Sequence, residues 1–248
     1  MAKQHQDGAN WPRTAAVFGA SGGIGQALCS TLVELGCERI YAGSRAASDP
    51  TGDATTPFTF DLTDERSIAA AAKLMRDDPP QWILVATGAL TLADGSGPER
   101  TYKRIDAAHM AEVLALNTIG PAMIAKHMLP FMPRAEPGIF AALSARVGSI
   151  GDNGLGGWHS YRASKAALNM LLKNFAIELG RTHPKAIVAG LHPGTVETGL
   201  SAPFQSNVPD GKLFTPDFSA RKLLDVLASL SPEDSGYVFD WQGERIAE

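Results

Sequence analysis

The sequence predicts an α/β fold built on a parallel, doubly wound sheet of about seven strands, with helices on both faces. The first observation behind this prediction is that short β-rich runs alternate with helical stretches about seven times along the chain, which is typical of parallel sheets. The second is the run from Trp82 to Ala86, which is apolar at consecutive positions. Such a run indicates a strand that is covered on both faces.

The predicted elements follow one another without a break in composition. Strands are expected at residues 13–18, 39–42, 58–60, 82–86, 138–143, 186–191 and 237–241. Helices are expected at residues 23–35, 64–75, 106–128, 160–179 and 218–230. Gly36 ends the first helix, Asp64 can cap the second, and Pro121 is expected to kink the third. We therefore expect a single domain over residues 13–248.

Composition and charge exclude several classes of protein. The 248 residues include 22 Lys and Arg against 26 Asp and Glu, a net charge of −4, so bulk charge does not favour nucleic-acid or membrane partners. No apolar run reaches the ~18–20 residues of a membrane span. Residues 1–12 lack the apolar core of a secretory signal and are expected to form a flexible tail.

The cysteines and histidines indicate a compartment and argue against a metal. Cys29 and Cys37 lack CxxC spacing, so we expect free thiols and a cytoplasmic, reducing location. The six histidines are scattered, which predicts no metal site.

A glycine-rich turn follows the first strand and opens the first helix. Its glycines allow a tight turn, close approach of backbone N–H groups to a pyrophosphate, and close packing of the helix on the sheet. The N-terminus of the helix favours an anion as well. The pattern predicts a dinucleotide site, although a tight turn without a ligand would use the same glycines. The expected contacts are Gly19, Ser21, Gly22, Gly23, Ile24 and Gly25.

The end of the second strand indicates which dinucleotide binds. Sites for NAD usually place an acidic residue there, about 20 residues after the turn, but this chain has Ser44 followed by Arg45. A carboxylate would repel a 2′-phosphate, whereas a guanidinium can bind it with two hydrogen bonds. We therefore expect NADP (NADPH) in preference to NAD. The alternative is that Arg45 only caps a solvated loop.

Tyr161 and Lys165 are four residues apart in a predicted helix, so their side chains share one face. A free phenol has a pKa of about 10, which is too high for efficient proton exchange near neutrality. One cation at about 4 Å, with an effective dielectric constant of about 20, favours the phenolate by about 4 kcal/mol. We therefore expect Lys165, helped by an oxidised nicotinamide ring, to lower the pKa of Tyr161, so that the phenol can donate a proton to a developing alkoxide. The same spacing also occurs by chance in surface pairs.

Six motifs in chain order resemble the short-chain dehydrogenase/reductase family, over residues 13–244. They are the glycine turn at 19–25, the pair Asp61-Leu62, Asn117 on the long helix, Ser144 at a strand end, the pair Tyr161 and Lys165, and the segment 193–198, which reads PGTVET. Two stretches, 117–132 and 235–243, resemble the C-factor and sniffer-like carbonyl reductase branch of that family.

The resemblance implies a Rossmann-type fold and hydride transfer between a nicotinamide and a small carbonyl or alcohol. Tyr161 would donate or accept the proton, and Ser144 would hydrogen-bond the substrate oxygen. Lys165 would also bind the nicotinamide ribose, and Asn117 would hold a water that joins Lys165 to solvent. The further cofactor contacts implied are Asp61, Leu62, Ala86, Thr87, Gly88, Tyr161, Lys165, Pro193, Gly194, Val196 and Thr198.

Two positions depart from the family pattern. Thr87 stands where the family has the Asn of its Asn-Ala-Gly motif, and Phe18 stands where it has a Thr before the first glycine. The first change affects the adenosine side of the site, and the second affects core packing.

The substrate side is expected from a Gly/Pro-rich segment over residues 199–215, which we interpret as a lid. Its apolar residues indicate an apolar ligand, but a lid that packs on its own scaffold would need them equally; they are Leu200, Phe204, Val208 and Leu213. Trp158 should lie near Tyr161, either shaping the pocket or packing, and His192 could relay a proton.

Several alternatives remain open at this stage. The chain could be a dinucleotide-binding signalling or sensor protein of C-factor type with little or no turnover, although Ser144, Tyr161 and Lys165 argue against pure binding. A nucleotide-sugar epimerase is disfavoured because an extra substrate domain is missing. A homodimer, a homotetramer and a monomer are all compatible with the sequence.

Overall fold

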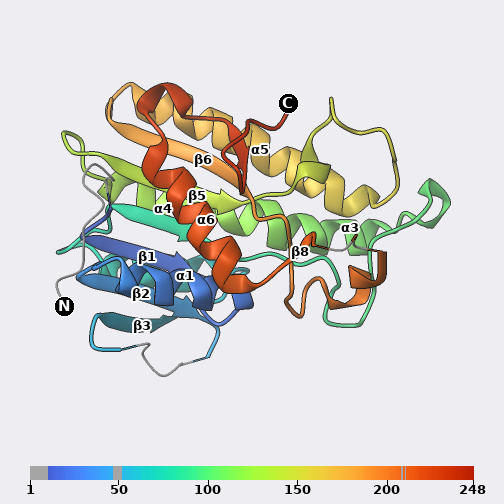
Figure 1. The fold of residues 1–248 in the computed structure, drawn as a ribbon, viewed down its shortest axis with the longest axis horizontal. Helices are drawn as coiled ribbons and strands as arrows, with labels where there is room; N and C mark the ends of the chain where they lie inside the picture. The colour runs from blue at the N-terminus through green and yellow to red at the C-terminus, as the bar shows by residue number, and fades with distance from the viewer. Residues whose placement is uncertain (1–10, 47–51, 208, 210) are drawn as a thin grey trace.

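A seven-stranded parallel sheet forms the centre of the computed structural model, which describes residues 11–46, 52–207, 209 and 211–248 (Figure 1). The strand order is β3-β2-β1-β4-β5-β6-β9, and every pairing is parallel. The strands are β1 (Thr14–Phe18), β2 (Arg39–Ser44), β3 (Thr55–Thr59), β4 (Trp82–Val85), β5 (Gly138–Leu143), β6 (Ala186–His192) and β9 (Val238–Asp240). The predicted fold class is confirmed.

Helices cover both faces of this sheet, as the sequence predicts. α1 (Gly23–Glu34) and α6 (Pro216–Ser229) pack on one face. On the other face lie α2 (Glu65–Leu74), α4 (Gly120–Met128) and α5 (His159–Gly180). All four residues of β4 are buried, which explains why its sequence is apolar at consecutive positions.

The sheet reverses its strand order between β1 and β4, because the chain builds outward from β1 to β3 and then from β4 to β9. In doubly wound sheets, ligands bind at the carboxyl ends of the strands beside this reversal. In Figure 1 those ends point to the right, toward α3 (Ala107–Leu114). A small second sheet, β7 (Thr195–Val196) with β8 (Leu213–Phe214), also lies on that side.

The long helix predicted at 106–128 is interrupted. α3 is followed by a π-helical turn, η2 (Ala115–Ile119), before α4 begins. Pro121 has no backbone N–H to donate, and the wider turn lies directly before it. Short 3₁₀ helices complete the chain: η1 (Tyr102–Arg104), η3 (Leu129–Phe131), η4 (Arg146–Gly148), η5 (Ala202–Asn207) and η6 (Pro232–Asp234).

Two other expectations differ from the structure. Residues 1–10 of the predicted tail lie outside the described residues, but Trp11 and Pro12 are packed: the Trp11 ring lies 6.1 Å from that of Trp82. β3 begins at Thr55 rather than near Phe58. Its Pro57 hides the strand pattern, yet β3 is an edge strand, where proline is tolerated.

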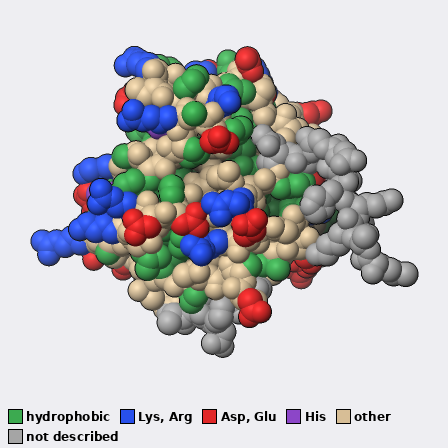
Figure 2. Space-filling view, turned by 90° about the vertical axis from the view of Figure 1, so that its left-hand side faces the viewer, with side chains coloured by type: hydrophobic (Ala, Val, Ile, Leu, Met, Phe, Trp, Pro, Cys, Tyr) green, Lys and Arg blue, Asp and Glu red, His purple; other side chains and the backbone are tan. Residues whose placement is uncertain are grey.

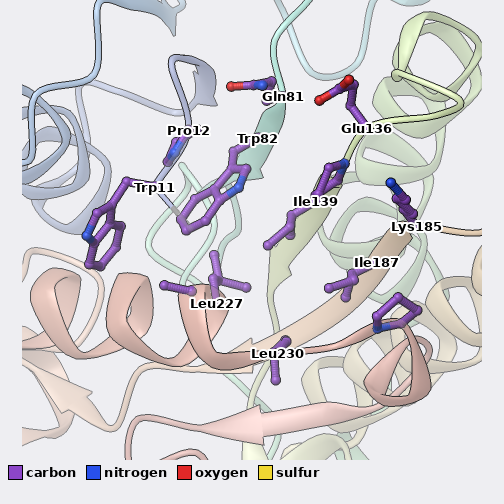
Figure 3. Close-up of a pocket in the computed structure, with 13 residues that line it drawn as sticks. Trp11, Pro12, Gln81, Trp82, Glu136, Ile139, Lys185, Ile187, Leu227 and Leu230 are labelled. Carbon is purple, nitrogen blue, oxygen red and sulfur yellow. The ribbon is translucent and has the colours of Figure 1, made fainter. Parts of the chain in front are cut away.

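The amino ends of the strands carry mixed charge and a small cavity. Figure 2 shows basic and acidic side chains side by side over this edge of the molecule, where Asp78 pairs with Arg13 at 3.1 Å and with Arg39 at 2.8 Å. Figure 3 shows a cavity of about 290 Å³ here, lined by Trp11 and Trp82 among others. None of the predicted site residues lines it.

In the part of the chain that the structure describes, every helix is too short or too polar to span a bilayer.

Candidate active site

The glycine turn between β1 and α1 is held by backbone hydrogen bonds to the neighbouring strand. Gly19 N and Ala20 N donate to the carbonyl oxygen of Gly43 at 2.9 and 2.8 Å. Gly19 has φ +99°, which favours glycine. A Cβ on Gly25 would lie 2.0 Å from the carbonyl oxygen of Gly19, so only glycine lets α1 pack this closely on the turn.

The N-terminus of α1 fits an anionic ligand. Its N-cap, Gly22, makes no side-chain cap, and the first turn has no acidic residue, so the first N–H groups point outward without a side-chain partner. Ser21, Gly22 and Gly23 are exposed there. Thr87, two residues after β4, lies against the glycine turn, where a Cβ on Gly19 would lie 3.1 Å from its Cγ2. Its hydroxyl is buried without a hydrogen-bond partner among the described residues. These residues therefore fit the pyrophosphate and adenosine side of a dinucleotide.

The ends of β2 and β3 lie side by side, as the nucleotide prediction requires. Arg45 is exposed directly after β2, and the hydroxyl of the buried Ser44 donates to the carbonyl oxygen of Ala46. Hydrogen bonds from Thr63 lower the pKa of Asp61, and the charge of Arg45 contributes to the shift. An ionised Asp61 and an exposed guanidinium thus share this edge.

Two further residues, Leu62 and Phe18, pack close to the expected nucleotide site. Leu62 packs on α4, where a Cβ on Gly120 would lie 2.3 Å from its Cγ. Phe18, at the position where the family has Thr, is fully buried and packs edge-on against Phe58 and Phe60 at 5.2 and 5.1 Å. This departure changes core packing behind the turn.

α5 carries Tyr161 and Lys165 on one face, as predicted. Lys165 Nζ donates to the carbonyl oxygen of Leu143 at 2.8 Å and lies 5.8 Å from the centre of the Tyr161 ring. Burial lowers the pKa of Lys165 to about 8 and raises the pKa of Tyr161 to about 12. Desolvation is the cause of this raised phenol pKa, and the expected lowering by Lys165 together with a nicotinamide ring stays a prediction. Tyr161 is a neutral acid at neutral pH.

Asn117 lies on the π-helical turn η2, and its amide holds the loop that follows β4. Nδ2 donates to Ala89 O at 2.8 Å and to Ser164 Oγ at 3.1 Å, and Oδ1 accepts from Ala89 N at 2.8 Å. A Cβ on Gly88 would lie 3.1 Å from Asn117 Oδ1 and 3.5 Å from Lys165 Nζ. Asn117 therefore positions Gly88 beside Lys165, and both its N–H groups are used by protein partners rather than by a water.

Ser144 hydrogen-bonds to a residue of α5 other than Tyr161. Its hydroxyl donates to Asn169 Oδ1 at 2.6 Å, one turn beyond Lys165 on α5. Among the described residues, no hydrogen bond joins Ser144 and Tyr161. The role expected for Ser144, holding the substrate oxygen, thus requires its hydroxyl to leave Asn169. Sequence spacing alone contained no signal for this contact.

An aromatic row leads from Tyr161 to the predicted lid. The ring of Trp158 lies 6.2 Å from that of Tyr161 and 5.3 Å from that of Phe204, in η5. Leu200 and Leu213 are more exposed, at 43% and 37%, and Val208 lies outside the described residues. Trp158 therefore contacts both Tyr161 and Phe204, which belongs to the predicted lid.

The segment after β6, residues 193–198, contacts both β8 and α1. Gly194 has φ +76°, and a Cβ there would lie 2.6 Å from the Phe214 ring. Pro193 O accepts from Ser219 Oγ at 2.9 Å, Val196 is buried in β7, and Thr198 reaches α1, where a Cβ on Gly23 would lie 2.8 Å from its Cγ2.

His192, at the end of β6, is a poor proton relay. Burial, together with the charge of Arg146, lowers its pKa to about 4, so the imidazole is neutral near neutral pH. Within the described ranges, no group of His, Cys, Asp and Glu could hold a metal ion.

Comparison with known proteins decides the family. The model of the family described as short chain dehydrogenase matches residues 13–209. The chain is a short-chain dehydrogenase. Relatives with dehydrogenase and reductase names extend over most of the chain, so this short-chain dehydrogenase is an NAD(P)-dependent oxidoreductase.

Two relatives illustrate the range of the match. The C-signal protein of Myxococcus xanthus is 37% identical over 143 residues, which cover 57% of this chain and 80% of that protein. The 1-hydroxy-2-glutathionyl-2-methyl-3-butene dehydrogenase of Rhodococcus sp. is 30% identical over 226 residues, covering 90% of this chain and 94% of that protein.

Solved structures agree with the fold. NADPH-bound carbonyl reductase from chicken fatty liver is 26% identical, with a TM-score of 0.81 over 98% of this chain and 97% of that chain. The carbonyl reductase Sniffer of D. melanogaster is 19% identical, with a TM-score of 0.82 over 95% of this chain and 99% of that chain. The second likeness shows the fold alone.

Proposed function

We propose that this short-chain dehydrogenase is an NADPH-dependent carbonyl reductase or alcohol dehydrogenase for small substrates. The observation that carries the proposal is the convergence of Tyr161 and Lys165 with Gly88, at the strand ends beside an open glycine turn. Nicotinamide would lie between Gly88 and the segment 193–198. The pyrophosphate would lie on the N-terminus of α1.

The reaction divides between the cofactor and the chain. When bound, the dihydronicotinamide supplies the hydride for the carbonyl carbon. Tyr161 supplies the proton for the carbonyl oxygen, and its raised pKa means that the phenol is protonated at neutral pH and needs help to release the proton. Lys165, held by Leu143 O, places an ammonium beside the phenol and so favours the phenolate that remains. The product is the alcohol, and the reverse reaction uses Tyr161 as the base.

The preference for NADPH is supported by the exposed Arg45 and the absence of an acidic residue at Ser44. The structural relative from chicken liver has NADPH bound. Asp61 and Leu62 would contact the adenine, and Ala86 and Thr87 the adenosine side.

A second candidate function is a dinucleotide-binding signalling protein with little turnover. The 37% identity to the C-signal protein favours it. The buried pair of Tyr161 and Lys165 argues for chemistry instead, because burying the ammonium and the phenol disfavours their charged forms and binding alone does not require them.

A screen of NADPH consumption over ketones, aldehydes and quinones separates the two candidates. The wild type should turn over at least one class, and Tyr161→Phe should lose about 100-fold or more in kcat. Tyr102→Phe is the matched control, since this tyrosine is 68% exposed in η1 and should keep full activity. Full turnover by Tyr161→Phe would contradict the mechanism. Tight NADPH binding with no reduced substrate would favour signalling.

We also propose a cytoplasmic protein without nucleic-acid or membrane partners, as a homodimer, a homotetramer or a monomer. Burial raises the pKa of Cys29 to about 12 and of Cys37 to about 11, so both thiols stay unreactive.

Met170 and Ile177 are 62% and 52% exposed on α5 and support association through that helix. Light scattering of the purified protein measures the mass.

A further inference from the structure

Glu99 is a buried acidic residue that the sequence did not single out. It lies in the loop between β4 and η1, and only 7% of it is exposed. Its carboxylate accepts from Ser160 N at 3.1 Å and from the hydroxyl of Ser160. Its backbone carbonyl accepts from Trp158 N at 2.5 Å. Side chain and backbone of Glu99 therefore both dock on the first residues of α5.

α5 has no cap from its own sequence. Its N-cap, Trp158, lies in the left-handed region with φ +50° and makes no side-chain hydrogen bond to the helix. Free N–H groups at a helix N-terminus need an acceptor, and a negative charge is favourable there. The carboxylate of Glu99 supplies both from 61 residues away in the chain. Burial is the largest influence and opposes its ionisation, but the hydrogen bonds from Ser160 and from its own backbone, together with the charge of His109, lower the pKa of Glu99 on balance.

The hydrogen bonds between Glu99 and Ser160 lie next to the candidate site. Ser160 immediately precedes Tyr161, and Lys165 follows one turn later. The same loop is held at its beginning, where Asn117 bonds to both backbone groups of Ala89. Gly88, which faces Lys165, thus belongs to a loop that is fastened to the helical layer at each end.

We propose that Glu99 is a positioning residue, which holds the first turn of α5, and with it Tyr161, in the orientation that proton transfer to the substrate needs. The inference rests on the proposed function, since it assigns a residue that supports the same phenol.

The variants follow from the hydrogen bonds. Glu99→Ala removes the acceptor and should lower kcat at least tenfold. Glu99→Gln keeps a carbonyl oxygen for Ser160 N, and its amide N–H can donate to the Ser160 hydroxyl, so it should recover most of kcat. Asp64→Ala is the matched control, because the Asp64 carboxylate caps α2 through Arg66 N at 3.0 Å and α2 carries none of the site residues.

Hydrogen exchange of the peptide spanning residues 158–165 gives a readout that needs no turnover. Glu99→Ala should speed exchange there, and Asp64→Ala should not. An inactive wild type with faster exchange in Glu99→Ala would reject the proposed function and leave the cap in place. The inference is overturned if Glu99→Ala matches the active wild type in kcat, if its exchange is unchanged, or if Glu99→Gln is as impaired as Glu99→Ala.

Discussion

Lys165 donates from its ammonium to the carbonyl oxygen of Leu143 at 2.8 Å, so the helix that carries the candidate acid is tied to the end of β5. This bond holds the Lys165 ammonium in a buried position, where desolvation disfavours its charged form. The pKa of Lys165 is lowered from 10.5 to about 8, mainly by desolvation. Activity and stability therefore make opposite demands on this side chain.

Lys165→Met should abolish turnover and stabilise the fold at pH 7. The unfolded chain binds the proton more tightly, so the folded wild type carries a cost of about 3 kcal/mol below pH 8, offset by about 1 kcal/mol from the bond to Leu143. As pH rises from about 8 to 10.5, wild-type stability should rise toward that of the variant. Urea unfolding at several pH values measures the difference, and parallel curves would contradict the buried ammonium.

His192→Asn should make the protein more resistant to acid. Burial lowers the folded pKa of His192 from 6.5 to about 4, so the unfolded chain binds the extra proton first. Wild-type stability should fall by up to about 3 kcal/mol as pH drops from 6.5 to 4, and the variant should lose less over that range. Thermal unfolding between pH 4 and 7 tests this. An equal loss in both proteins would mean that His192 is accessible to protons in the fold.

Arg45→Asp should raise the KM for NADPH by about 10- to 100-fold, because a charge-assisted pair is replaced by repulsion. The KM for NADH should stay the same or fall. Arg66→Asp makes the same change of charge at an exposed position of α2 and controls for the overall field. If both variants weaken NADPH equally, Arg45 does not read the 2′-phosphate.

Ser144→Ala should keep kcat within about tenfold of the wild type, because the hydroxyl donates to Asn169 and not toward Tyr161. Losing one hydrogen bond of this kind costs about 1 kcal/mol in stability. Steady-state kinetics beside Tyr161→Phe measure the contrast. A loss as large as that of Tyr161→Phe would show that Ser144 turns to the substrate during the reaction.

The fold could be predicted because its determinants are local. Periodicity, the glycine turn and alternating elements all act over a few residues, and the seven strands follow from them. The chemistry of Tyr161 could be predicted only in part. Spacing brings Lys165 to the same face, but the burial that raises the phenol pKa exists only in the folded chain.

The misses share a physical cause. Glu99 reaches Ser160 across 61 residues, and Ser144 reaches Asn169 across 25. No periodicity in one segment records which partner lies opposite it after folding. The two-residue strands β7 and β8 are also too short to produce a pattern. Trp11 looked like part of a tail because its partner, Trp82, is far along the chain.

The four tryptophans give the protein optical reporters in three regions, the third being Trp241, which packs on Phe214 at 4.6 Å. Trp11 and Trp82 lie together at the amino ends of the strands, while Trp158 contacts Tyr161 and Phe204 at the other edge. Emission from the first pair reports the packing of the strand starts, and emission from Trp158 reports entry of a ligand beneath the lid. Substituting Trp158 with Phe should remove the signal beside Tyr161 and leave the signals of the Trp11–Trp82 pair and of Trp241, so fluorescence titrations of the two proteins side by side assign the part of the change that comes from ligand entry.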